Sequence, residues 1–158
     1  RDCLLSRGLG DVYKRQADTP ITWRILQATA ERLALIRTSG GARTDMGADV
    51  RLEPRQFDPA DTTGCITLFT ASVVRPDGAR SPGERELTMI IELTVPAAWD
   101  SAQETAVAAV EDVEDILDDW LPFNGALPLR FQESMFLDRP DGMPAVVAQL
   151  MFGTGWRR

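Results

Sequence analysis

The sequence has 158 residues, a formal net charge of −7, two cysteines and no histidine. This length suits one domain with its own core, and the acidic balance disfavours binding to nucleic acid or to an anionic membrane. Without histidine the commonest general base and metal ligand is absent, two cysteines are too few for a disulfide framework, and no run of 18 apolar residues predicts a membrane span.

Residues 1–16 differ in composition from the rest of the chain. They contain the only lysine, Lys14, the only tyrosine, Tyr13, and the cysteine Cys3. The segment Asp11-Val-Tyr-Lys-Arg-Gln16 resembles translated sequencing-adapter read-through. We therefore predict that residues 1–16 are a non-native or disordered N-terminal extension, with a genuine flexible arm as the alternative, and that residues 17–158 form a single domain.

A helix is predicted over residues 21–38. Thr19 is placed as its N-cap and Pro20 at its first helical position, while Gly40 and Gly41 are expected to end it. Apolar residues at spacings of three and four predict one buried face. These residues are Trp23, Leu26, Ala30, Leu33 and Ile36.

Three strands are predicted next, over residues 49–52, 65–74 and 86–95. Residues 65–74 are apolar and β-branched on both faces, which is typical of a central strand and predicts a buried thiol at Cys65. Residues 86–95 alternate between apolar and polar side chains, which indicates a half-solvated strand antiparallel to the one before it. The apolar side consists of Leu87, Met89, Ile91, Leu93 and Val95.

A second helix is predicted to begin with a capping box formed by Ser101 and Glu104. Its expected buried stripe consists of Ala106, Val110, Val113, Leu117 and Trp120. Strands are predicted over residues 127–137 and 145–153, and Trp156 is expected on a mobile tail. The element order α-β-β-β-α-β-β predicts an α+β fold with a mixed or mostly antiparallel sheet of about five strands and two helices packed on one face.

The sequence contains little that indicates catalysis. It has no Gly-x-Ser-x-Gly elbow, phosphate loop or paired-cysteine spacing. Asp112, Asp115 and Asp119 share one face of the second helix, but carboxylates on a straight helix rarely complete the shell of a hard cation, so a solvated or interface face is favoured. Asp45 precedes a glycine turn and is expected to bond to backbone rather than to act in catalysis. We predict no enzyme activity, no metal site and no cofactor.

The segment between the first helix and the sheet carries a family resemblance. Its residues read Ile36-Arg-Thr-Ser-Gly-Gly-Ala-Arg-Thr-Asp-Met-Gly-Ala-Asp-Val50. This pattern resembles the N-terminal half of tail-terminator proteins, also called tail-completion or minor tail proteins, of bacteriophages with long non-contractile tails. Ala42 stands where that family usually has an aromatic residue. The resemblance continues loosely over residues 65–120, and only residues 43–50 are specific.

The resemblance implies a structural virion protein with an α+β fold. Such a protein forms a ring, usually a hexamer, on the head-proximal end of the tail tube, ends tube polymerisation and provides the head-joining surface. The implied partners are copies of itself, the tail tube protein and a head-side connector, with no membrane, and DNA would pass through the lumen without specific binding. The implied location is the tail or neck of a virion assembled in the host cytoplasm. The loop residues implied in assembly are Arg43, Thr44, Asp45 and Gly47.

Two other functions remain open at this point, a head–tail neck connector and a small-molecule-binding regulatory α+β module. A closed ring of more than two subunits needs two unlike patches on each subunit. One hypothesis is that an arginine loop of one subunit meets the acidic helix of the next, and the alternative is that both are solvated surface. The loop residues are Arg75, Arg80 and Arg85, and the helix residues are Asp112, Asp115 and Asp119.

Overall fold

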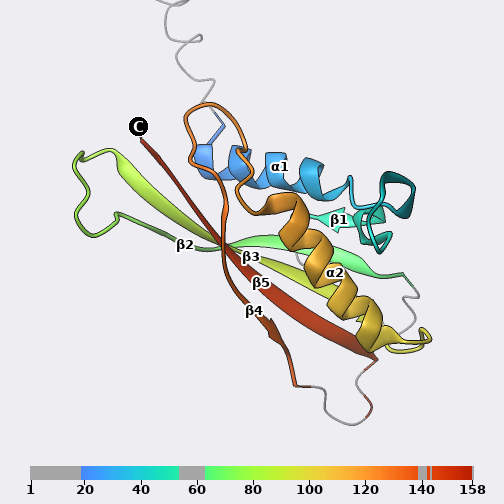
Figure 1. Cartoon of the computed structure of the whole chain (residues 1–158). Helices are drawn as coiled ribbons and strands as arrows, with labels where there is room; N and C mark the ends of the chain where they lie inside the picture. Colours follow the sequence, from blue (N-terminus) through green and yellow to red (C-terminus); the bar gives the residue numbers. More distant parts are fainter. Residues whose placement is uncertain (1–18, 54–62, 139–141, 143, 158) are drawn as a thin grey trace, which may run out of the picture.

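The computed structural model describes residues 19–53, 63–138, 142 and 144–157. Within them the chain forms a five-stranded mixed sheet with two helices on one face, as predicted (Figure 1). The helices are α1 (Ile21–Leu33) and α2 (Ala102–Leu117). The strands are β1 (Val50–Arg51), β2 (Cys65–Val74), β3 (Glu84–Pro96), β4 (Arg130–Phe136) and β5 (Ala145–Arg157). None of the described helices is long and apolar enough to cross a membrane.

The strand order in the sheet is β1-β2-β3-β5-β4. Only β1 runs parallel to its neighbour, and the other three pairs are antiparallel. The longest pairing joins β3 to β5, from Glu84 opposite Arg157 to Pro96 opposite Ala145. Figure 1 shows these two strands as the long central axis of the sheet, with both helices lying above it.

The core lies between the helices and one face of the sheet. The predicted apolar side of β3 is confirmed, since Leu87, Met89, Ile91, Leu93 and Val95 are all fully buried. On β5 their partners in register include Phe152 and Leu150, which are also fully buried. Small residues of α2, Ala106 and Ala109, are completely enclosed and pack in the same core. Each large apolar side chain buried in this way stabilises the fold by about 1.5–3 kcal/mol.

The first helix differs from its prediction at both ends. Pro20 is itself the N-cap, without a side-chain cap bond, and the helix ends at Leu33, five residues before the predicted boundary. Beyond the helix, the N–H of Gly47 donates to the carbonyl of Ile36 (3.1 Å), which holds the following loop against the segment that leaves the helix. The buried residues of the helix are Ile25, Leu26, Thr29 and Leu33, so the prediction that Trp23 is buried is wrong.

Two further predictions are corrected near the other elements. Ser101, the N-cap of α2, has a left-handed backbone (φ 58°) and makes no side-chain cap bond, so the predicted capping box is wrong. Trp156 does not lie on a mobile tail. It is buried, because β5 continues to Arg157 to match the full length of β3, which begins two residues earlier than predicted.

Candidate functional site

The loop between α1 and β1 is held from within by Asp45. The backbone N–H of Thr38 donates to Asp45 Oδ1 (2.9 Å), and the Thr38 hydroxyl donates to the same carboxylate at 3.0 and 3.1 Å. The prediction that Asp45 accepts a backbone N–H bond is therefore confirmed. These bonds favour the ionised carboxylate and lower the pKa of Asp45, first through the backbone N–H of Thr38 and then through its hydroxyl.

Gly47 lies where the loop returns to the end of α1. A Cβ atom built on Gly47 would lie 2.5 Å from the carbonyl oxygen of Leu33 and 2.7 Å from that of Ile36. Both neighbours are backbone atoms, which cannot move aside as a flexible side chain does. The close approach of two backbone segments, rather than a special φ angle, is what requires glycine at this position.

The same loop is fastened to α2 by the buried carboxylate of Asp112. The backbone N–H of Arg43 donates to Asp112 Oδ1 (2.9 Å), and the backbone N–H and hydroxyl of Thr44 both donate to Asp112 Oδ2 (2.8 Å each). Asp112 is only 4% exposed. One side chain of α2 therefore satisfies two backbone donors and one hydroxyl of a loop that lies nearly seventy positions earlier in the chain.

The guanidinium of Arg43 covers the outer side of this junction. Its Nη1 donates to Asp115 Oδ2 (2.8 Å) and to Asp112 Oδ1 (3.2 Å), and its Nε lies 3.2 Å from Glu111 Oε2. These carboxylates raise the pKa of Arg43, the hydrogen bond to Asp115 contributing most and that to Asp112 next. We call the contacts of Arg43 and Thr44 with Asp112 and Asp115 the loop–helix junction.

The junction brings together residues that the sequence analysis had treated separately. Arg43 and Thr44 of the loop motif lie against Asp112 and Asp115 of the acidic helix in the same chain. The prediction that Asp112 belongs to an exposed acidic face is wrong. Asp112 borders the apolar stripe of α2, so the loop covers it, whereas Asp115 stays exposed. Asp119 is also exposed, but it lies beyond the end of α2 at Leu117 with a left-handed backbone, so the prediction that the three acids share one helical face is wrong.

Acidic residues continue past the end of α2, at Asp118 and Asp119. Asp119 pairs with Arg130 (3.0 Å), and Asp118 accepts the backbone N–H of Phe131 (3.0 Å). The pKa of Glu114 is raised, first by burial and then by the nearby charges of Asp115, Asp118 and Glu111. Like charges are thus crowded on this face. The described residues nevertheless contain no group of three or more acids, cysteines or histidines arranged to hold a metal ion.

The three predicted arginines lie on and beside the hairpin loop that joins β2 to β3. Arg85 Nη1 donates to the backbone carbonyls of Pro82 (2.8 Å) and Glu84 (2.7 Å). Arg75 and Arg80 are exposed, and within the described part of the chain their side chains make no hydrogen bond or ion pair, although Arg75 attracts Glu84 at longer range. Figure 1 shows this hairpin extending away from the helices, so the arginines do not meet the acidic face of α2 in their own chain.

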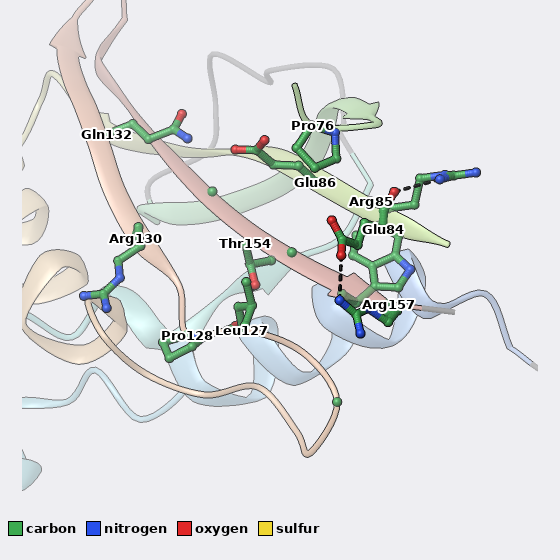
Figure 2. Close-up of a pocket in the computed structure, with 14 residues that line it drawn as sticks. Pro76, Glu84, Arg85, Glu86, Leu127, Pro128, Arg130, Gln132, Thr154 and Arg157 are labelled. Carbon is green, nitrogen blue, oxygen red and sulfur yellow. Dashed lines mark hydrogen bonds and ion pairs between the residues drawn. The ribbon is translucent and has the colours of Figure 1, made fainter. Parts of the chain in front are cut away.

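A second feature, which the sequence analysis missed, is a groove of about 850 Å³ at the end of the sheet where β5 finishes. Its lining includes Gly153, Gly155 and Trp156 of β5, together with Leu127 and Arg130 (Figure 2). The signal in the sequence is the Gly-x-Gly spacing inside a strand, since glycine at such positions often marks a place where another backbone comes close.

These observations define an α+β domain with a loop motif joined to an acidic helix and a groove at one end of its sheet. No protein-family model and no curated protein matches the sequence. Among solved structures, the chain is similar to one from a virion of a native gene transfer agent particle, with 20% identity, a TM-score of 0.55 and coverage of 86% of this chain and 91% of that one. A second solved chain has 16% identity and a TM-score of 0.47, covering 87% of this chain and 96% of its own length. The first match shows that the fold is shared over nearly the whole of both chains.

Proposed function

We propose that this chain is a structural protein of a phage-like virion, and more specifically a tail terminator that closes the tail tube as a ring. The observation that carries the proposal is the shared fold with a chain of a virion particle over 86% of this chain and 91% of that one. The Arg43-Thr-Asp-x-Gly47 motif, which resembles that of the tail-terminator family, supports the finer assignment. The motif serves a structural role, because its polar groups bind the protein's own backbone and helix.

A ring subunit needs two unlike surfaces that complement each other, and this chain offers a charged pair. Within the described residues the exposed side chains of Arg75 and Arg80 make no hydrogen bond or ion pair, and like charges are crowded around Glu114 of α2. We propose that the arginine hairpin of one subunit, including Arg85, faces the acidic surface of the next at Asp115 and Asp119. Exposed charge pairs of this kind set orientation and association rate more than affinity.

The two open ends of such a ring would meet different partners, the tail tube protein on one side and a head-side connector on the other. DNA would move through the lumen without specific binding. The formal net charge of −7 suits this role, because a negative wall repels phosphate and keeps the duplex from adhering.

The experiment that tests the ring is size exclusion with light scattering, followed by electron microscopy of the purified protein. We expect closed rings, usually hexamers, and we expect that adding the protein to a cognate tail tube protein during polymerisation stops tube growth. A wild-type protein that stays monomeric at every concentration and leaves tube length unchanged would refute the proposed function.

The proposed charged contact has its own test. Arg75→Glu with Arg80→Glu should break rings into monomers without lowering the melting temperature, whereas Arg75→Lys with Arg80→Lys should keep them. Adding Asp115→Arg should restore rings to the double glutamate variant. Asp112 is unsuitable for this rescue because it is buried in the loop–helix junction. Intact rings in the double glutamate variant would exclude the contact while leaving the ring itself in place.

A further inference from the structure

The outer edge of β2 is open along its second half. Among the described residues β1 is the only strand on that side, and it pairs with Ile66 and Thr67 alone. Leu68 is fully buried, but residues 70, 71, 73 and 74 are exposed. Residues 65–74 contain no charged side chain and no proline, which are the usual protection of an exposed edge. Figure 1 shows this half of β2 extending beyond the helices, where another chain can reach it.

The outer edge of β4, on the other side of the sheet, is open along its C-terminal half. Its first half is covered, because the N–H of Phe131 donates to the carboxylate of Asp118 (3.0 Å). Exposed apolar side chains gather on the two open segments, which hold five of the eleven large ones in the described part of the chain. These five are Val73, Val74, Met135, Phe136 and Leu137. Such a concentration on unprotected edges is typical of a contact surface.

The hydrogen bonds of β2 show which of its backbone groups face outward. The N–H of Ile66 donates to the carbonyl of Asp49 on the β1 side (2.9 Å), and alternation along the strand then directs the N–H and carbonyl of Thr70 to the same side. A register shift between Thr70 and Ser72 inserts one extra residue. The next outward residue is therefore Val73.

The open segment of β4 has a matching pattern. The N–H of Leu137 donates inward to the carbonyl of Val147 (3.0 Å), so Ser134 and Phe136 direct their backbone groups outward. The extra residue in β2 makes the step from Thr70 to Val73 equal to the step of two residues on β4, because a bulge sets two residues opposite one. All three strand pairs from β2 to β4 are antiparallel, so β4 of a second copy beside β2 continues the same alternation of direction.

We propose that the open edge of β4 in one subunit pairs with the open edge of β2 in the next, with Phe136 opposite Thr70 and Ser134 opposite Val73. This inference rests on the proposed function, since it names the contact that joins the subunits of the ring. The two edges are unlike and lie at opposite sides of the sheet, so the contact repeats head to tail and can close. Pairing of two β2 edges would instead join a dimer and leave both β4 edges open.

Charge supports the same arrangement. Arg75 directly follows β2, and the antiparallel direction brings it toward the first half of the neighbour's β4. Three acids lie on or beside that half, Glu133, Asp118 and Asp119, against the single base Arg130. The pairing therefore carries the arginine hairpin of one subunit to the acids of the next, which is the charged contact proposed above.

Disulfide trapping tests the register. In a Cys3→Ser background, Val73→Cys with Ser134→Cys should give, after mild oxidation, a ladder of covalent oligomers up to the ring size. Within one chain β3 and β5 separate the two positions by about 14 Å, whereas a bridge needs Cα atoms within about 7 Å. Val74→Cys with Ser134→Cys is the matched control, because Val74 is similarly exposed but its side chain faces the opposite side of the sheet. This control should give no ladder.

A charge on the edge provides the second measurement. Phe136→Lys should raise the dissociation constant of the ring at least tenfold without changing the melting temperature, because a charged side chain on an open edge opposes pairing. Leu35→Lys, at another exposed apolar position outside both edges, should leave the constant unchanged.

The edge pairing and the proposed function fail in different ways. Rings that persist in Phe136→Lys would overturn the pairing and leave the function standing. The same holds for intact rings whose trapped pair gives no ladder, gives bands that stop at the dimer, or reacts no better than the Val74 control. A protein that never forms rings would overturn both.

Discussion

Removal of the Asp112 carboxylate is the sharpest test of the loop–helix junction. Asp112→Ala would leave the backbone N–H groups of Arg43 and Thr44 and the Thr44 hydroxyl without their acceptor. Thr44 is itself buried, so water cannot easily replace the lost bonds. A buried donor left unpaired costs about 1–3 kcal/mol, and loss of one partner from a buried charged network costs about 3–5 kcal/mol.

We therefore expect Asp112→Ala to lower the free energy of unfolding by about 3–5 kcal/mol, which for a domain of this size lowers the melting temperature by roughly 10 °C. Asp112→Asn keeps the shape and one acceptor oxygen but points an amide at donors, so an intermediate loss of about 1–3 kcal/mol is expected. Urea unfolding followed by circular dichroism measures both values, and Asp115→Ala is the control, because Asp115 is exposed and should cause no resolvable change. A loss below about 1 kcal/mol in Asp112→Ala would refute the role assigned to the junction.

Three other predictions concern single positions. Gly47→Ala should destabilise the protein by about 1–3 kcal/mol in urea unfolding, because the added Cβ would strike two backbone carbonyls. Gly40→Ala is the control and should be neutral, because the nearest atom to its added Cβ is 3.7 Å away. Equal effects of the two substitutions would contradict the steric argument. The pKa of Asp45 in the folded protein is lowered from its ordinary 3.8, so the ionised carboxylate stabilises the fold above pH 3.8. This contribution is lost as the pH falls through the lower pKa of the folded state. The melting temperatures of wild type and Asp45→Asn should therefore differ at pH 7 and converge below pH 3.8. Burial raises the pKa of the Cys65 thiol, so Cys65 should react slowly in the native protein. In a variant with Cys3 replaced, a thiol reagent should label the native protein slowly and the unfolded protein fast. Rapid labelling of the native protein would show that Cys65 is accessible.

The strands were the most predictable part of the fold. The alternation from Leu87 to Val95 is a local pattern with a period of two, and it places the same residues in the core wherever the partner strands lie. The end of β5 was not predictable in this way. Trp156 is enclosed because β5 pairs with the start of β3, a partner about seventy residues away that no local pattern identifies.

The candidate site was predictable in its parts but not in its connections. The role of Asp45 follows from a local turn pattern, since its partner Thr38 is only seven residues away. The sequence pattern predicts that Asp112 is exposed, because an acidic residue among other acids on a helix usually lies on the surface. The available signal was its position beside the apolar stripe, three residues after Ala109 and one before Val113, both of which are fully buried. Its partner Thr44 lies 68 positions away, a distance at which sequence spacing carries no information.

The strand order has a consequence for the timing of folding. β5 follows β4 in the chain but lies between β3 and β4 in the sheet. During synthesis β4 therefore has no strand to pair with until β5 has emerged, and β3 keeps one edge open for the same period. Open edges of this kind are templates for unwanted pairing with other chains. The topology of the fold therefore leaves the edges of β3 and β4 uncovered until the last strand has been made.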